Sequence, residues 1–208
     1  MKILSHATLF VGAASLLLML SACDSEAKLA REITGTWATA PEKLIDHEAM
    51  SATAVRMMQF TPSLSDSKSG DMQMTALVSI TNAMPGDTTS IIEPYTVSAS
   101  GLATLNGAWA VVDDDKVILH LDESTLDVTV DPEAVLVSVN TLTDVTTTTV
   151  DSIKPSIAVN LKKQITDAVR NQVFNTSKID DIKLTGNLMS CEINHHDVTL
   201  RRQDSIIK

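Results

Sequence analysis

The sequence feature that most limits the fold of this chain is a period-two alternation of apolar and polar residues that recurs in separate segments. In residues 72–81, one side of an extended chain would be apolar: Met72, Met74, Ala76, Val78 and Ile80. The opposite side is polar apart from Leu77. This alternation is typical of a β-strand with one buried and one solvated face. Because the same period recurs at 126–131, we expect a mainly β chain.

Polar turns between β-rich runs predict antiparallel hairpins. Residues 113–116 separate the runs 102–112 and 117–121, and residues 194–197 separate the last two expected strands. The other segments in which we expect strands are 135–139, 182–184, 187–193 and 198–202. The Thr-rich stretch 141–150 is also expected to be extended, because β-branched threonine suits a strand with a wet face.

Two segments favour helices instead. Residues 25–32 are rich in good helix formers, and Ser25 can cap them. Further along, apolar residues follow a 3.6-residue spacing: Ile157, Leu161, Ile165, Ala168, Val169 and Val173. Pro155 is expected near the start of this helix and Asn175 at its end. A chain of roughly eight to ten strands with one substantial helix suits an antiparallel barrel, with a β-sandwich as the alternative.

Composition limits the partners of the chain. Its 208 residues carry 16 Lys and Arg against 26 Asp and Glu, for a net charge of -10. Nucleic-acid binding depends on clustered basic residues, so nucleic acid is not an expected partner. With 44% hydrophobic residues, the chain can bury a core, which excludes global disorder.

The N-terminus has the layout of a secretory signal. Lys2 precedes an apolar run at residues 9–20, in which Ser15 is the one polar residue, and small residues follow it. The run Leu20-Ser21-Ala22-Cys23 resembles the lipobox of bacterial lipoproteins, and the resemblance implies cleavage before Cys23 and acylation of its thiol. We therefore expect a signal peptide at 1–22, a lipidated N-terminus with a short helix at 23–32, and one β-rich domain at 33–208. The expected location is the bacterial cell envelope, with the lipid anchor in either the outer or the inner membrane.

A second resemblance concerns the shape of the domain. Gly35-Thr36-Trp37 resembles the G-x-W signature of lipocalins and related calycin barrels. In those proteins the tryptophan plugs the closed end of the barrel, and an arginine from the final strand packs over it. The apolar phase of 198–202 selects Arg202 as the partner of Trp37. A second G-x-W ends at Trp109, where the family has no such requirement, and we interpret both tryptophans as architectural.

The sequence offers little catalytic chemistry. It contains no G-x-S-x-G, H-E-x-x-H, P-loop or dinucleotide motif. Ser65 and Lys68 match S-x-x-K, but they lie in a polar loop. His195 and His196 fall in a turn, whereas Cys191 is expected to face inward, so these side chains should not converge on zinc. We predict no enzyme activity, no cofactor and no metal.

Methionines suggest where a ligand could lie. Met72 and Met74, with Met57 or Met58 from the preceding strand, could line an adaptable apolar cavity. The competing interpretation is that they fill a core poor in aromatic residues. We expect a non-catalytic, lipid-anchored domain that is open to a small apolar ligand. The alternative is a packed interaction module without a ligand that docks an envelope protein through an exposed edge such as the Thr-rich run.

Overall fold

The computed structural model describes residues 25–84, 95–139, 147–173 and 176–203, and the expected signal segment and Cys23 lie outside them. The described part is mainly β, with one helix over residues 25–33 and a longer helix, α2 (Thr147–Val173). The first six strands are β1 (Gly35–Thr39), β2 (Glu42–His47), β3 (Met50–Pro62), β4 (Ser69–Met84), β5 (Tyr95–Asp113) and β6 (Lys116–Leu121). The others are β7 (Asp127–Val130), β8 (Leu136–Val139), β9 (Lys178–Thr185), β10 (Leu188–Ile193) and β11 (His196–Gln203).

The sheet closes on itself into an antiparallel, lipocalin-like barrel. Hydrogen-bonded neighbours follow the order β1-β11-β10-β9-β6-β5-β4-β3, and β3 pairs again with β1. At the closing seam, Trp37 of β1 lies opposite both Arg202 of β11 and Met58 of β3. This closure confirms the barrel and excludes the sandwich, because a sandwich would keep two separate sheets.

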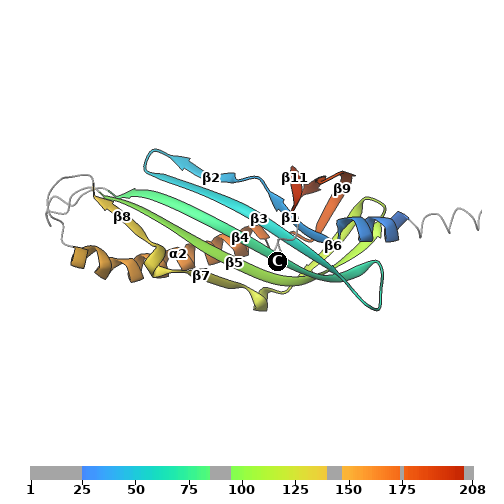
Figure 1. The fold of residues 1–208 in the computed structure, drawn as a ribbon, viewed down its shortest axis with the longest axis horizontal. Helices are drawn as coiled ribbons and strands as arrows, with labels where there is room; N and C mark the ends of the chain where they lie inside the picture. The colour runs from blue at the N-terminus through green and yellow to red at the C-terminus, as the bar shows by residue number, and fades with distance from the viewer. Residues whose placement is uncertain (1–24, 85–94, 140–146, 174–175, 204–208) are drawn as a thin grey trace, which may run out of the picture.

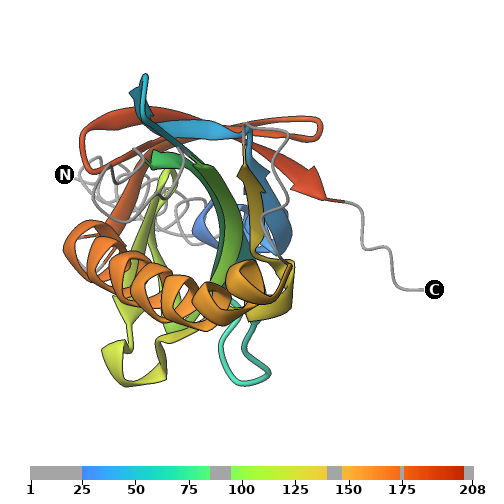
Figure 2. The ribbon, with the colours of Figure 1, turned by 90° about the vertical axis from the view of Figure 1, so that its left-hand side faces the viewer.

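Three strands are too long for the barrel alone. β5 has 19 residues, which at about 3.4 Å per residue gives a length of roughly 60 Å. β3, β4 and β5 therefore run beyond the barrel side by side (Figure 1). There they form an open, curved extension, with β2 added at β3 and β7 and β8 added at β5. Figure 2, a view along the long axis, shows α2 on one side of the interior that the strands surround.

The molecule has two apolar cores that follow these two parts. The barrel core contains Trp37, Phe60 and Trp109, and the helix over residues 25–33 adds Leu29, Ala30 and Ile33 to it. The extension core forms between the sheet and one face of α2, whose buried residues are Ala158, Leu161, Ile165 and Val169. Burying each large aliphatic side chain contributes about 1.5–3 kcal/mol, so α2 stabilises the extension through this face.

A glycine on β5 lets α2 approach the sheet. A Cβ atom at Gly101 would lie 2.3 Å from Cδ1 of Ile165, far inside van der Waals contact. The side chain of Ile165 therefore occupies the space that a larger residue on β5 would fill. This contact helps to set the position of α2 against β5 and β7.

The structure corrects the prediction for the Thr-rich stretch. α2 begins at Thr147, so residues 147–150 are helical and do not form the exposed strand edge expected there; residues 140–146 lie outside the described part. Pro155 stands inside the helix instead of near its start. α2 packs against the sheet through residues further along the helix. This packing outweighs the modest preference of threonine for strands, because propensity differences are fractions of a kcal/mol per residue.

Candidate functional site: a groove along helix α2

The interior of the barrel is filled by side chains. Met72 and Met74 are buried in the same cluster as Trp37 and Trp109, with exposures of 3% and 5%. The sequence did not decide whether Met57 or Met58 of the preceding strand would line the interior. Met58 faces inward, with an exposure of 1%. Met57 lies on the outward phase and is only half-buried, because neighbouring residues of a strand point to opposite faces. The methionines therefore fill the core, and Met57 is not part of an interior lining.

The structure brings the signature residues together at one end of the barrel. The guanidinium of Arg202 lies 4.3 Å from the centroid of the Trp37 ring, the pair that the apolar phase of the last strand selected. Arg202 also donates from Nη1 to the carbonyl of Thr34 at 2.7 Å, and from Nη2 to the carbonyl of Glu32. Trp37 Nε1 donates to the carbonyl of Ile33 at 2.7 Å. These bonds fasten the end of the helix over residues 25–33 onto the barrel.

The second tryptophan is also architectural. Trp109 is buried and meets Phe60 edge to face, with a centroid distance of 5.9 Å and an interplanar angle of 87°. Its Nε1 donates to the carbonyls of Thr61 and Asp71, at 3.2 and 3.0 Å. This arrangement satisfies the buried indole N–H while the ring fills the core.

An apolar groove lies outside the barrel, between α2 and the sheet extension. Its volume is about 270 Å³. The sheet contributes Ala52, Ala54, Ala76, Val78 and Ile80, and α2 contributes Ile165, Ala168 and Val169. Small residues on β3 and β4 leave this space, because alanine side chains cannot reach the helix as leucine or phenylalanine would. At the end near Met50, Ile80 and Gln164, a second cavity of about 530 Å³ adjoins the groove.

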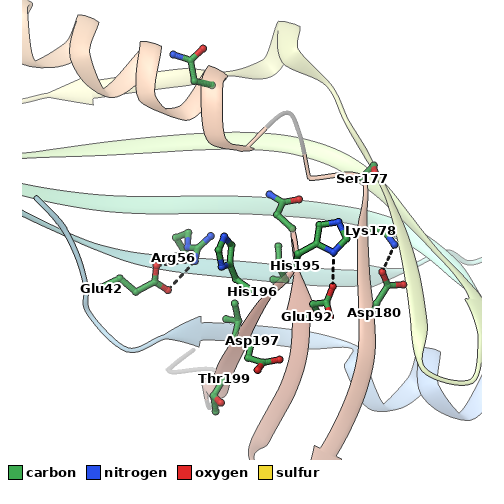
Figure 3. A pocket seen from close by; sticks show the side chains of 14 residues that line it. Glu42, Arg56, Ser177, Lys178, Asp180, Glu192, His195, His196, Asp197 and Thr199 are labelled. Carbon is green, nitrogen blue, oxygen red and sulfur yellow. Dashed lines mark hydrogen bonds and ion pairs between the residues drawn. The ribbon is translucent and has the colours of Figure 1, made fainter.

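A polar cavity adjoins the other end of the groove. It has a volume of about 890 Å³ and shares Glu42 and Arg56 with the groove. Figure 3 shows the pair of Arg56 with Glu42 on one side of this cavity, and the pairs of His195 with Glu192 and of Lys178 with Asp180 on the other. The space along α2 is therefore apolar in its middle and charged where groove and polar cavity meet.

Arg56 is the key residue at this junction. Its Nη2 donates to both carboxylate oxygens of Glu42, at 2.9 and 2.8 Å. Its Nε is buried and has no hydrogen-bond partner among the described residues. A buried donor without a partner is costly, so an acceptor that reached this atom would relieve that cost. Arg56 was missed in the sequence, although its place on the inward phase between Ala54 and Met58 marks it as a charge between two apolar cores.

The ionisable groups near the junction are perturbed by their neighbours. Burial raises the pKa of the Cys191 thiol to about 11, and the nearby Arg56 charge opposes part of this effect. The hydrogen bond from Lys178 lowers the pKa of Asp180, and a second lysine, Lys116, acts in the same direction. Cys191 is thus a neutral, buried thiol that packs inward with Met189 and Ile193, as expected from the alternation.

The other groups considered from the sequence are dispersed or exposed. Nδ1 of His195 lies 3.0 Å from Glu192, while Cys191 is buried inside. Lys68 pairs with Glu26, and Ser65 lies in an exposed loop. Of the residues described, one acidic group could hold a metal ion, with ligand atoms within 4.8 Å of one another: Asp113, Asp114 and Asp115. It lies at the solvated β5–β6 turn.

No protein-family model matches the chain, and no curated protein matches it in sequence. In the part of the chain that the structure describes, no helix combines the length and apolar character that crossing a membrane requires.

Proposed function

We propose that this chain is a lipid-anchored cell-envelope protein whose non-catalytic, lipocalin-like domain binds a small apolar ligand in the groove along α2. The observation that carries the proposal is the apolar groove that ends at the half-buried side chain of Arg56, whose Nε is buried and has no partner among the described residues. Small-molecule sites typically combine an apolar lining of about 300–1,000 Å³ with a few placed polar groups. The groove alone is slightly smaller than this, but together with the adjoining cavity near Met50 it falls within the range, whereas the barrel interior is filled by side chains.

The polar end of the groove favours a ligand with an anionic head. Arg56 holds the Glu42 carboxylate through Nη2, which shows that a carboxylate fits against this guanidinium, and Nε has no partner among the described residues. A guanidinium presents several donors in a fixed fork and can hold more than one acceptor. We therefore propose an amphiphile with one apolar chain along α2 and a carboxylate or phosphate head at Arg56.

Pairing of the charged groups supports a non-catalytic role. In the polar cavity, Lys178 binds Asp180, His195 binds Glu192, and Arg56 binds Glu42. A catalytic centre brings an acid or base and a nucleophile to one reacting atom, whereas these pairs are divided between two sides of the cavity (Figure 3). The neutral Cys191 is buried, which makes it a poor nucleophile.

The lipid anchor would face the closed end of the barrel. The helix over residues 25–33 starts two residues after Cys23 and packs into the barrel core. A two-residue tether reaches at most about 7 Å. Acylation of Cys23 would therefore hold the Trp37 end beside the bilayer and leave the groove along α2 further from it. Palmitate labelling tests the anchor: the wild-type chain should be labelled and Cys23→Ser should not, whereas an unlabelled wild type overturns the anchor.

Ligands of equal chain length test the groove and its head site separately. Dodecanol, dodecanoate and dodecyltrimethylammonium share an apolar chain of similar length and have a neutral, an anionic and a cationic head, respectively. We expect all three to displace a fluorescent apolar probe such as 1-N-phenylnaphthylamine, with dodecanoate at least tenfold tighter than dodecanol. A hydrogen bond to a charged group contributes about 1.5–3 kcal/mol, and 1.4 kcal/mol corresponds to a factor of ten.

Variants on each side of the ion pair sharpen this test. Arg56→Gln should remove the preference for dodecanoate, and Glu42→Gln should increase it, because the guanidinium loses its internal competitor. Lys178→Gln, a charge removed elsewhere in the polar cavity, should leave the preference unchanged. If none of the three ligands binds, the proposed function is wrong. If they bind with equal affinity, the groove stands and the anionic head is wrong.

A further inference from the structure

The outward face of the three long strands carries no formal charge over five consecutive cross-strand rows. The rows are Gln59–Gln73–Asn106, Met57–Thr75–Thr104, Val55–Leu77–Leu102, Thr53–Ser79–Ser100 and Ser51–Thr81–Ser98. We name these fifteen residues the uncharged face. Their strand neighbours of the other phase, such as Met58, Met74 and Val78, lie in the cores, so the fifteen side chains point away from the interior.

The uncharged face has an apolar centre. In its middle row, Leu77 is 43% exposed and Leu102 is 40% exposed, and Val55 lies directly opposite Leu77. Directly opposed residues on neighbouring strands have Cβ atoms about 4.5–5.5 Å apart, so the three side chains form one continuous stripe. Met57 from the adjacent row extends it. Exposed stripes of this kind mark interaction surfaces when polar residues surround them.

Six of the eleven polar residues of the face are bonded to one another in cross-strand pairs. Gln73 donates to Asn106 at 3.1 Å, and hydroxyl pairs span β4 and β5 at Ser79–Ser100, 3.1 Å, and Thr81–Ser98, 3.2 Å. A partner that covers these groups leaves them with the bonds they already have. Covering this face therefore avoids much of the penalty for burying polar groups without partners.

We propose that the uncharged face is a surface on which two copies of this chain pack against each other, with Val55, Leu77 and Leu102 at the centre. Each copy has a net charge of -10, so most approaches between copies are repelled. The uncharged face is a surface on which two acidic copies can meet with no charge at the centre of the contact, and the nearby carboxylates of Asp46, Asp71 and Asp127 lie at its border. Its apolar row lies in the middle of the five rows, which suits an isologous contact of a patch with itself.

The size of the uncharged face predicts a weak dimer. A standard protein interface uses roughly 20–30 residues on each side, more than the fifteen residues present here. We therefore expect monomer and dimer to exchange with concentration. Salt should strengthen the dimer, because it screens the repulsion between the two acidic copies while leaving apolar contacts in place.

Sedimentation velocity of the full chain over a range of concentrations tests the proposal. The wild type should shift from monomer toward dimer as concentration and salt rise, and Leu77→Lys and Leu102→Lys should both remain monomeric. Leu188→Lys is the matched control, because Leu188 is also 40% exposed but lies on β10. It should dimerise like the wild type.

Three outcomes overturn the proposal. The first is a wild-type chain that stays monomeric at every concentration. The second is a dimer that persists in both lysine variants or weakens with salt. The third concerns cells: a photo-crosslinker at Leu102 should give a product of two copies of this chain, and an adduct with a different protein would instead assign the face to a heterologous partner.

Discussion

The guanidinium of Arg202, near the end of β11, covers the indole ring of Trp37, near the start of β1, with 4.3 Å between them. The two residues also lie opposite each other in the strand register. Because β1 pairs with β3 on its other side, this contact lies where the barrel closes. The lipocalin-like signature in this chain is therefore a lock between the first and last strands of the barrel.

Removal of the Arg202 side chain should weaken this lock. Arg202→Ala loses a cation–π contact, worth about 0.5–2 kcal/mol, and two hydrogen bonds to the end of the first helix. We expect the free energy of unfolding in urea to fall by about 2–4 kcal/mol. Arg201→Ala removes an exposed arginine and should change it by less than about 0.5 kcal/mol. Equal effects of the two substitutions would contradict this role for Arg202.

A side chain at Gly35 should destabilise the fold. Its φ is +119° and an added Cβ would lie 3.0 Å from Nη1 of Arg202, so Gly35→Ala adds backbone strain and displaces the guanidinium. We expect a loss of about 1–3 kcal/mol. Gly186 is the matched control: its φ is +59° but no atom lies within 4 Å of an added Cβ. Gly186→Ala should cost only about 1–2 kcal/mol for the left-handed backbone, and a larger loss there than at Gly35 would be inconsistent with the lock.

Asp180 should make the free energy of unfolding depend on pH. The hydrogen bond from Lys178 lowers the pKa of Asp180 in the folded chain below its ordinary value of 3.8. The ionised carboxylate therefore stabilises the fold above that ordinary value, and this contribution is lost as the pH falls through the lowered pKa. Urea unfolding at pH 7 and pH 3 should show a smaller pH dependence for Asp180→Asn than for the wild type.

Lys178 provides the control for this pH dependence. Lys178→Gln keeps the carboxylate but removes its first partner, so it should reduce the pH dependence in part, with Lys116 still in place. If both variants retain the full wild-type loss of stability between pH 7 and pH 3, Asp180 does not contribute as described.

Much of the barrel could be predicted from the sequence, because apolar and polar residues alternate strictly along strands that have one buried face. Met72, Met74 and Val78 were predicted on one face and all three are buried, the two methionines in the barrel core and Val78 in the extension core. The hairpin at 113–116 and the final turn near 194–197 were also predicted, since polar turn residues separate apolar runs. Arg202 could be selected because the apolar phase of a short strand fixes which side chains share a face.

Other features depend on contacts that a local pattern does not contain. The start of α2 was missed because threonine favours strands locally. The contacts that hold α2 against the sheet begin further along the helix, at Ala158 and Leu161. β2 lacks a clear alternation and is held by pairing with β3. The groove itself arises where alanines of β3 and β4 face α2, a meeting of distant segments that spacing along one strand cannot show.

The central claim is that an apolar ligand lies along α2, and native mass spectrometry of the purified chain tests it most directly. Ala168 lines the groove and is exposed, so Ala168→Trp should fill the space without disturbing the core. Val159, also on α2, is 68% exposed, and Val159→Trp is the matched control. The account predicts a bound small amphiphile on the wild type and on Val159→Trp, and none on Ala168→Trp. A wild-type chain that is always empty, or an adduct that Ala168→Trp retains in full, would contradict it.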